Sequence, residues 1–130
     1  MAETVIKGLD HFVLYVADAE VTAAFYALHL GMAVQRFGPE GRLALSFGAQ
    51  KINLHTVTAP FLPHADRPAA GAGDFCLLTD EPVEEVKARL EMEGLAVESG
   101  PVARTGATGP LRSIYLRDPD GNLVEISNRA

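Results

Sequence analysis

Four side chains that could bind a metal lie on segments whose other residues predict buried strands. They are His11, His55, Asp74 and Glu125. A buried strand accommodates an imidazole or a carboxylate when that group is paired or bound to a metal. Imidazole and carboxylate together suit Zn, Ni, Fe(II), Mn and Co, and two histidines with one carboxylate form the facial set of non-haem iron enzymes. The sequence therefore predicts a divalent-metal site and leaves the identity of the ion open.

The candidates recur because the chain repeats itself. A shift of 63 residues lays segment 10–14 over 73–77 and segment 30–34 over 93–97, with identities at Phe, Leu, Gly, Ala and Val. The same shift lays His11 over Asp74, whereas His55 and Glu125 are 70 residues apart. We attribute the difference to a longer loop in the second half, around Val102 to Pro110. On this interpretation, two halves place four candidate ligands at two equivalent positions.

Each half predicts a strand, a helix and three further strands. The predicted strands are 9–16, 32–37, 42–48 and 51–57 in the first half, and 74–79, 95–99, 111–117 and 122–128 in the second. Asp18 can cap the first helix, and Gly31 ends it. Pro82 suits the start of the second helix, and Gly94 ends it.

Apolar spacing predicts which face of each helix is buried. The predicted stripes are Val21, Ala24, Phe25 and Leu28 in the first helix, and Val83, Val86 and Leu90 in the second. The sequence thus predicts an α+β domain over residues 1–130. It consists of two tandem βαβββ modules, at about 8–57 and 73–128, joined by a proline-containing linker over 58–72.

Composition narrows the class of protein. The 130 residues are 48% apolar and 22% charged, which is typical of a soluble globular domain. A net charge of −6 disfavours nucleic acid as a partner. No apolar run approaches a membrane span, no signal peptide is visible, and the single cysteine fits a reducing compartment. We expect a cytoplasmic protein, and the small core favours a homodimer.

The segments LDHFVLYVADAEVTAAFYALHLGM and LRDPDGNLVEIS, together with the repeat, resemble the vicinal oxygen chelate superfamily. That group includes glyoxalase I, fosfomycin-resistance proteins, bleomycin-binding proteins and extradiol dioxygenases. The resemblance covers nearly the whole chain. The segment GPVARTGATGP over 100–110 is similar to small glyoxalase-domain proteins whose substrates are not settled. The resemblance implies a partly open, cup-shaped β-sheet barrel with a metal at its base, often completed across a dimer.

The ligand positions of the superfamily carry over one at a time. His11 matches the first-strand ligand, and Glu125 matches the last-strand glutamate. His55 falls where glyoxalase I-like members tend to have glutamate. Asp74 falls where many members have histidine, and the shorter aspartate leaves two roles open: direct ligand, or a group that orients a ligand or a water.

The resemblance implies a divalent-metal-dependent enzyme acting on a small substrate with vicinal oxygens. The reaction would be of the lyase or isomerase type, with Glu125 as the catalytic base, or ring cleavage by a dioxygenase. Arg104, in the predicted long loop, could clamp an anionic group of the substrate, and Tyr15, on the same strand face as His11, would also contact it. The alternative is a metal-free dimeric protein that binds a drug and confers resistance.

Overall fold

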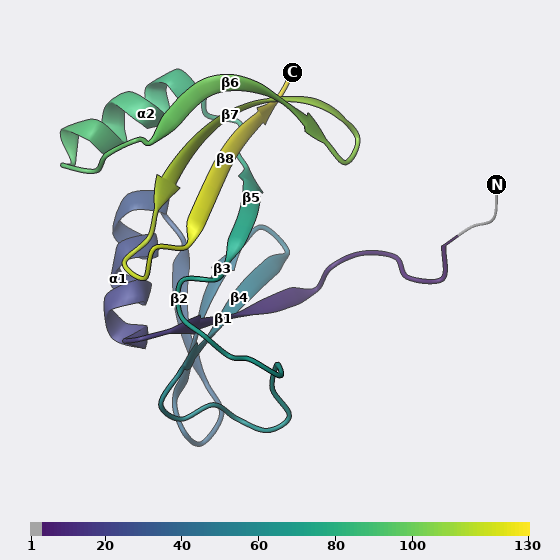
Figure 1. The fold of residues 1–130 in the computed structure, drawn as a ribbon, viewed down its shortest axis with the longest axis vertical. Coiled ribbons are helices and arrows are strands. Elements are labelled where there is room, and N and C mark those ends of the chain that lie inside the picture. Colours follow the sequence, from purple (N-terminus) through teal and green to yellow (C-terminus); the bar gives the residue numbers. More distant parts are fainter. Residues whose placement is uncertain (1–3) are drawn as a thin grey trace. The chain divides into compact units, whose positions relative to one another are not determined.

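The computed structural model describes residues 4–130 of the chain. The chain divides into two compact units, with the boundary between Pro68 and Ala69 (Figure 1). This boundary lies within the predicted linker. No helix of the described residues is long and apolar enough to cross a membrane.

The first unit is an open four-stranded sheet with one helix. Its elements are β1 (His11–Val16), α1 (Ala19–Leu30), β2 (Ala33–Phe37), β3 (Arg42–Phe47) and β4 (Gln50–Thr56). The strand order is β1-β4-β3-β2, with β1 parallel to β4 and the other pairs antiparallel. Helix α1 is therefore the crossover connection that follows β1 and packs mainly on β3.

The second unit repeats this arrangement. Its elements are β5 (Asp74–Leu78), α2 (Val83–Met92), β6 (Ser99–Gly106), β7 (Gly109–Arg117) and β8 (Leu123–Arg129). The order is β5-β8-β7-β6, again with the first and last strands of the unit parallel. The predicted α+β class and the two tandem βαβββ modules are confirmed.

The ends of helix α1 follow the sequence, but its buried face does not. Asp18 accepts hydrogen bonds from the backbone N–H groups of Glu20 and Val21, and Gly31 adopts φ 68° beyond the last turn. The buried residues are Thr22, Ala23 and Tyr26, whereas the predicted Val21 and Leu28 are 53% and 72% exposed. The prediction was wrong because alanines and large apolar residues of α1 itself occur on every side of the helix. Spacing alone cannot identify its inner face.

The expected loop before β7 is a strand. Residues 95–98 are not in a strand, and β6 instead runs through Arg104 to Gly106, where it forms a hairpin with β7. Glycine and proline in this segment predicted a loop. Gly100 and Pro101 lie where the β6–β7 register shifts, between Ser99 and Val102. The pairing of β6 with β7 then continues beyond them. Arg104 is therefore fixed in a sheet rather than carried by a long loop.

Strand alternation gives each sheet an apolar face and a polar face. The apolar face of the first sheet includes Leu14, Leu43, Leu45, Ile52 and Leu54. That of the second includes Ile114, Leu116, Val124 and Ile126, with the predicted stripe of α2, Val83, Val86 and Leu90, also buried. The candidate site residues all alternate with these apolar positions.

Candidate functional site

His11 and His55 lie on the same face of the first sheet but far apart along it. In the parallel pair β1–β4, His11 is opposite Lys51 and Tyr15 is opposite His55. His55 is thus four residues beyond the partner of His11, which corresponds to about 13 Å at the rise of a strand. The sheet does not bring the two imidazoles together.

The second sheet shows which residue of the first corresponds to Glu125. Asp74 is opposite Leu123 in the parallel pair β5–β8, and Glu125 is two residues beyond that partner. The same step from Lys51, the partner of His11, leads to Asn53. The expected equivalence of His55 and Glu125 was therefore wrong, and His55 instead corresponds to Ser127. His55 and Glu125 had been matched because both side chains can bind a metal, not because of strand register. Asn53 carries an amide, which is not ionisable, so it did not stand out as a candidate ligand.

Asn53 and His55 both carry a buried polar atom without a hydrogen-bond partner. Asn53 is 8% exposed and His55 is 9% exposed. The Oδ1 atom of Asn53 and the Nδ1 atom of His55 have no partner. An unsatisfied buried group costs roughly 1–3 kcal/mol, so both positions favour a bound ligand, ion or water.

The imidazole of His55 is held by aromatic contacts. Its ring packs edge to face with Tyr15 at 5.8 Å and with Phe61 at 5.4 Å between centroids. Burial, together with the nearby Arg42 guanidinium, lowers the pKa of His55. The Tyr15 hydroxyl accepts a hydrogen bond from the Ala65 backbone N–H at 3.2 Å. Tyr15, predicted to contact substrate, therefore ties the segment after β4 to the sheet.

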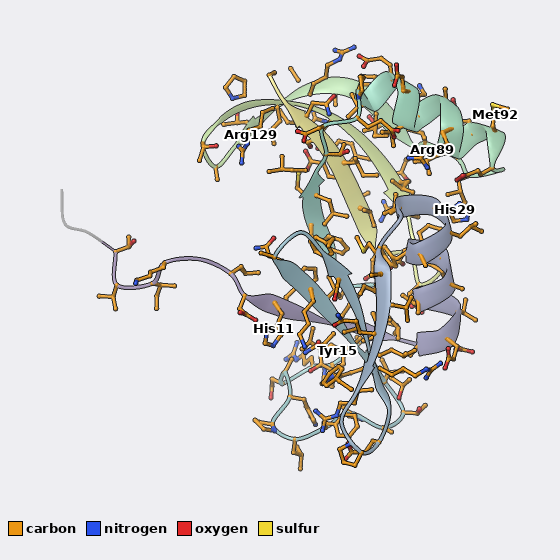
Figure 2. The ribbon with its side chains drawn as sticks, turned by 180° about the vertical axis from the view of Figure 1, so that it is seen from behind. His11, Tyr15, His29, Arg89, Met92 and Arg129 are labelled. Atoms are coloured by element: carbon orange, nitrogen blue, oxygen red, sulfur yellow. The ribbon has the colours of Figure 1, made fainter. Side chains whose placement is uncertain are left out.

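His11 is oriented by its neighbour. The Nδ1–H of His11 donates to the Asp10 carboxylate at 2.8 Å, and the His11 side chain is 43% exposed. Figure 2 labels His11 and Tyr15, which both lie on β1. A proton on Nδ1 leaves Nε2 with its lone pair. Histidines that bind metals commonly donate their other ring nitrogen to a carboxylate in this way. The pairing fits the predicted role of His11.

Glu125 lies within a hydrogen-bonded chain on the polar face of the second sheet. The Ser127 hydroxyl donates to Glu125 Oε2 at 3.3 Å, and the Oγ atoms of Ser127 and Ser113 are 2.6 Å apart. Cys76, directly opposite Glu125 in register, lies 3.1 Å from Ser127 Oγ through its Sγ. Burial raises the pKa of the Cys76 thiol, and the Glu125 carboxylate contributes to the rise. The sulfur is therefore a poor nucleophile near neutral pH.

Arg104 is on the same face as Glu125 and is held by a tyrosine that the sequence reasoning missed. Its Nε–H donates to the Tyr115 hydroxyl at 2.8 Å, and the guanidinium is 5.3 Å from the ring centroid. Tyr115 is directly opposite Glu125 in the β7–β8 register, and burial raises its pKa. Strands β6, β7 and β8 thus place an exposed cation, a phenol and a carboxylate on the same face of the second sheet.

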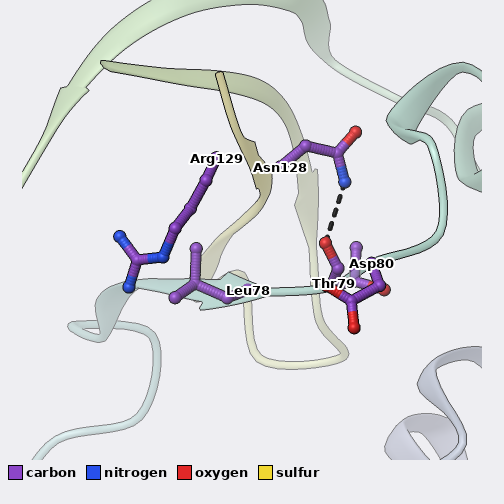
Figure 3. Close-up of a pocket in the computed structure, with 5 residues that line it drawn as sticks. All are labelled: Leu78, Thr79, Asp80, Asn128 and Arg129. Carbon is purple, nitrogen blue, oxygen red and sulfur yellow. Dashed lines mark hydrogen bonds between the residues drawn. The ribbon is translucent and has the colours of Figure 1, made fainter. Parts of the chain in front are cut away.

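A pocket of about 480 Å³ lies where β5 and β8 end, lined by Leu78, Thr79, Asp80, Asn128 and Arg129 (Figure 3). The Asn128 amide donates to the backbone carbonyls of Thr79 at 2.9 Å and Glu81 at 2.8 Å. These bonds join the two strand ends and satisfy the amide. We assign this pocket a structural role.

Within residues 4–130, no group of three or more His, Cys, Asp or Glu side chains gathers as a metal site would require. The first sheet carries His11 and His55, and the second carries Asp74 and Glu125. Ligation by these residues therefore stays a prediction.

A βαβββ unit used twice, with imidazole and carboxylate groups on the polar sheet faces, defines a known class of metal- and ligand-binding folds. The Glyoxalase/Bleomycin resistance protein/Dioxygenase superfamily matches residues 8–126, and the chain belongs to it.

Three similar proteins place the chain within the superfamily. It is 47% identical over 125 residues to virulence protein STM3117 of Salmonella typhimurium, covering 96% of this chain and 86% of that protein. The crystal structure of that protein superposes with a TM-score of 0.94 over 98% of this chain and 100% of the other. The glyoxalase domain-containing protein RDO1 of Mycosarcoma maydis is 46% identical, covering 95% and 69% of the two chains. Lactoylglutathione lyase from Agrobacterium tumefaciens is 26% identical, with a TM-score of 0.74 and 96% of each chain covered.

Proposed function

We propose that this chain is a divalent-metal-dependent enzyme acting on a small substrate with vicinal oxygens, by lyase, isomerase or ring-cleaving chemistry. The observation that carries the proposal is the shared register of donors in the two sheets. Each sheet has a donor at the start of its first strand, His11 or Asp74, and a second donor two residues beyond that residue's partner, Asn53 or Glu125.

The donor atoms fit a divalent ion. His11 offers Nε2, Glu125 offers a carboxylate, and Asn53 offers an oxygen without a protein partner. Nitrogen and oxygen donors of this kind suit Zn, Ni, Mn, Co and Fe(II). We therefore assign His11 and Glu125 as ligands and Asp74 as an orienting group, and place the first sheet's second donor at Asn53 in preference to the predicted His55.

Different residues of the chain would bind the ion, accept a proton and bind the substrate. His11, Asn53 and Glu125 would hold a divalent ion, which would supply Lewis-acid chemistry toward a substrate with vicinal oxygens. Glu125 would take up a substrate proton at its carboxylate, which the Ser127 hydroxyl orients. Arg104, held by Tyr115, would bind an anionic group of the substrate.

Calorimetric titration of chelator-treated protein with Zn, Ni and Mn tests the proposal. We expect stoichiometric binding that is lost in His11→Ala and in Glu125→Ala. Glu91→Gln, an exposed charge change on α2, is the matched control and should bind as the parent does. Unchanged affinity in both variants would contradict the assigned ligands. No binding of any ion would support the metal-free binding protein.

A further inference from the structure

The segment 60–68, which follows β4, is held to the first sheet by few contacts. Its large apolar side chains are Phe61, which is half-buried, and Leu62, which is 84% exposed. Among the described residues, the hydrogen bond that joins this segment to the sheet runs from the Ala65 backbone N–H to the Tyr15 hydroxyl, at 3.2 Å. A segment with so little buried surface opens at a much smaller free-energy cost than the sheet beneath it.

Phe61 packs on two polar side chains of the sheet. The antiparallel β3–β4 register places Arg42 and His55 opposite each other on the polar face of the first sheet. The Arg42 guanidinium lies 3.6 Å from the centroid of the Phe61 ring, and the same ring packs edge to face with His55 at 5.4 Å between centroids. Phe61 therefore covers the end of the polar face where β3 begins and β4 ends.

This arrangement leaves polar atoms buried without a partner. The Nε–H of Arg42 and the Nδ1 of His55 make no hydrogen bond within the protein. Both atoms would be hydrogen-bonded in water, so their burial opposes the aromatic and cation–π contacts that hold Phe61 in place. The two opposing contributions are of comparable size, which favours a segment that opens and closes.

We propose that residues 60–68 form a lid over the polar face of the first sheet. The Phe61 ring and the hydrogen bond from Ala65 to Tyr15 hold the lid closed. Opening withdraws the ring from the sheet and lets water or a ligand reach the polar atoms that the closed form buries. The lid requires no bound ion, so it stands or fails independently of the proposed metal site.

The lid determines when a ligand can use this part of the sheet. A molecule that hydrogen-bonds to Arg42 Nε–H or His55 Nδ1 binds the open form alone, and it therefore shifts the population toward that form. Asn53, whose Oδ1 is also buried without a partner, lies two residues before His55 on the same face of β4. The donor that we propose for a metal is thus next to the residues that the lid covers.

Exchange of the Arg42 Nε–H with water, measured by NMR on chelator-treated protein, reports the opening directly. This Nε–H is buried, whereas the side chain of Arg67 is 94% exposed and provides the unprotected reference. We expect the Arg42 Nε–H to exchange about tenfold or more slowly than that of Arg67, because exchange requires opening. Arg42→Lys identifies the signal. Equal exchange rates at the two arginines would overturn the proposal.

Two variants test what holds the lid closed. Tyr15→Phe removes the hydroxyl and keeps the ring, and we expect it to speed Arg42 exchange about threefold or more, because one hydrogen bond of the closed form is lost. Phe61→Ala should bring the rate close to that of Arg67. Tyr115→Phe, which removes a hydroxyl from the second unit, is the matched control and should leave Arg42 exchange unchanged.

Exchange of the backbone amides of β3 and β4, measured in the same samples, separates lid opening from unfolding of the sheet. We expect these amides to keep their protection in Tyr15→Phe while Arg42 exchange accelerates. Acceleration of Arg42 exchange only in step with these amides would overturn the proposal. Parental Arg42 exchange in both Tyr15→Phe and Phe61→Ala would also overturn it.

Discussion

Asp74 is the proposed site residue whose role the sequence leaves open between direct ligand and orienting group, and we propose the orienting role. Asp74 is exposed at the start of β5, and its register partner Leu123 lies two residues before Glu125 on β8. Aspartate is shorter than histidine, so its carboxylate reaches less far from the strand. We expect Asp74→Asn to weaken metal affinity about 10–100-fold, the effect of losing an outer partner of a ligand.

The matched substitution for Asp74 is Asp74→His, and both variants can be measured by competition with a chromogenic chelator. An orienting aspartate predicts little gain from the histidine. A loss far beyond 100-fold in Asp74→Asn, with binding restored in Asp74→His, would show that Asp74 is itself a ligand.

Asn53 and His55 give opposite predictions for the donor on β4. If Asn53 Oδ1 binds the ion, Asn53→Asp keeps the shape, adds a charge and should raise affinity by about tenfold or more. Asn53→Ala should lower it, and His55→Ala should leave it nearly unchanged. Zinc titrations of the three variants decide between them. If only His55→Ala loses zinc affinity, the donor on β4 is His55, as the sequence predicted.

The sequence singled out some residues of the proposed site and not others. It singled out His11 and Glu125 because an ionisable group on a buried strand is conspicuous, and their role as ligands stays a prediction. It gave no reason to propose Asn53, because an amide is common on strands and only the strand register, absent from the sequence, matches its position to that of Glu125. Tyr115 was missed for the same reason, since its contact with Arg104 requires the β6–β7 hairpin.

At the scale of elements, strands β7 and β8 are joined by a hydrogen bond between two buried serines, one on each strand. Ser113 and Ser127 are opposite each other in register, fully buried, and joined by a 2.6 Å hydrogen bond. Ser127→Ala leaves the Ser113 hydroxyl without this partner, and we expect a loss of about 1–3 kcal/mol in the free energy of unfolding.

Urea denaturation of the two single variants and the double variant measures this coupling. Removing both hydroxyls leaves neither serine hydroxyl without its partner, so the double variant should lose less than the two single losses added together. Strictly additive losses would show that the pair contributes nothing beyond its separate contacts.

The elements themselves were predictable where one local signal dominated. Asp18 and Gly31 mark the two ends of α1, because an N-cap residue and a left-handed residue each act on the adjacent turn of the helix. The inner face of α1 and the extent of β6 depend on packing and on pairing with a distant strand. In both cases local composition gave the wrong prediction: Val21 and Leu28 on the buried face of the helix, and a loop at Arg104.

At the scale of the whole molecule, membership of the superfamily fixes the fold and leaves the reaction open. The superfamily's own description joins glyoxalases, resistance proteins and dioxygenases. Function on a shared fold depends on particular side chains. The experiments on His11, Asn53 and Glu125 therefore carry more information about this chain than further comparison of folds.

The size of the chain leads to the last prediction, a homodimer. The 13.9 kDa chain leaves large apolar side chains exposed among the described residues, with Leu28 at 72% and Met92 at 90%. A chain of this length buries a modest share of its surface, so association would stabilise it by covering more apolar area. We expect sedimentation equilibrium at micromolar concentration to give twice the chain mass. The urea midpoint should also rise with protein concentration, because a dimer's stability depends on it. A mass of 13.9 kDa with a concentration-independent midpoint would establish a monomer.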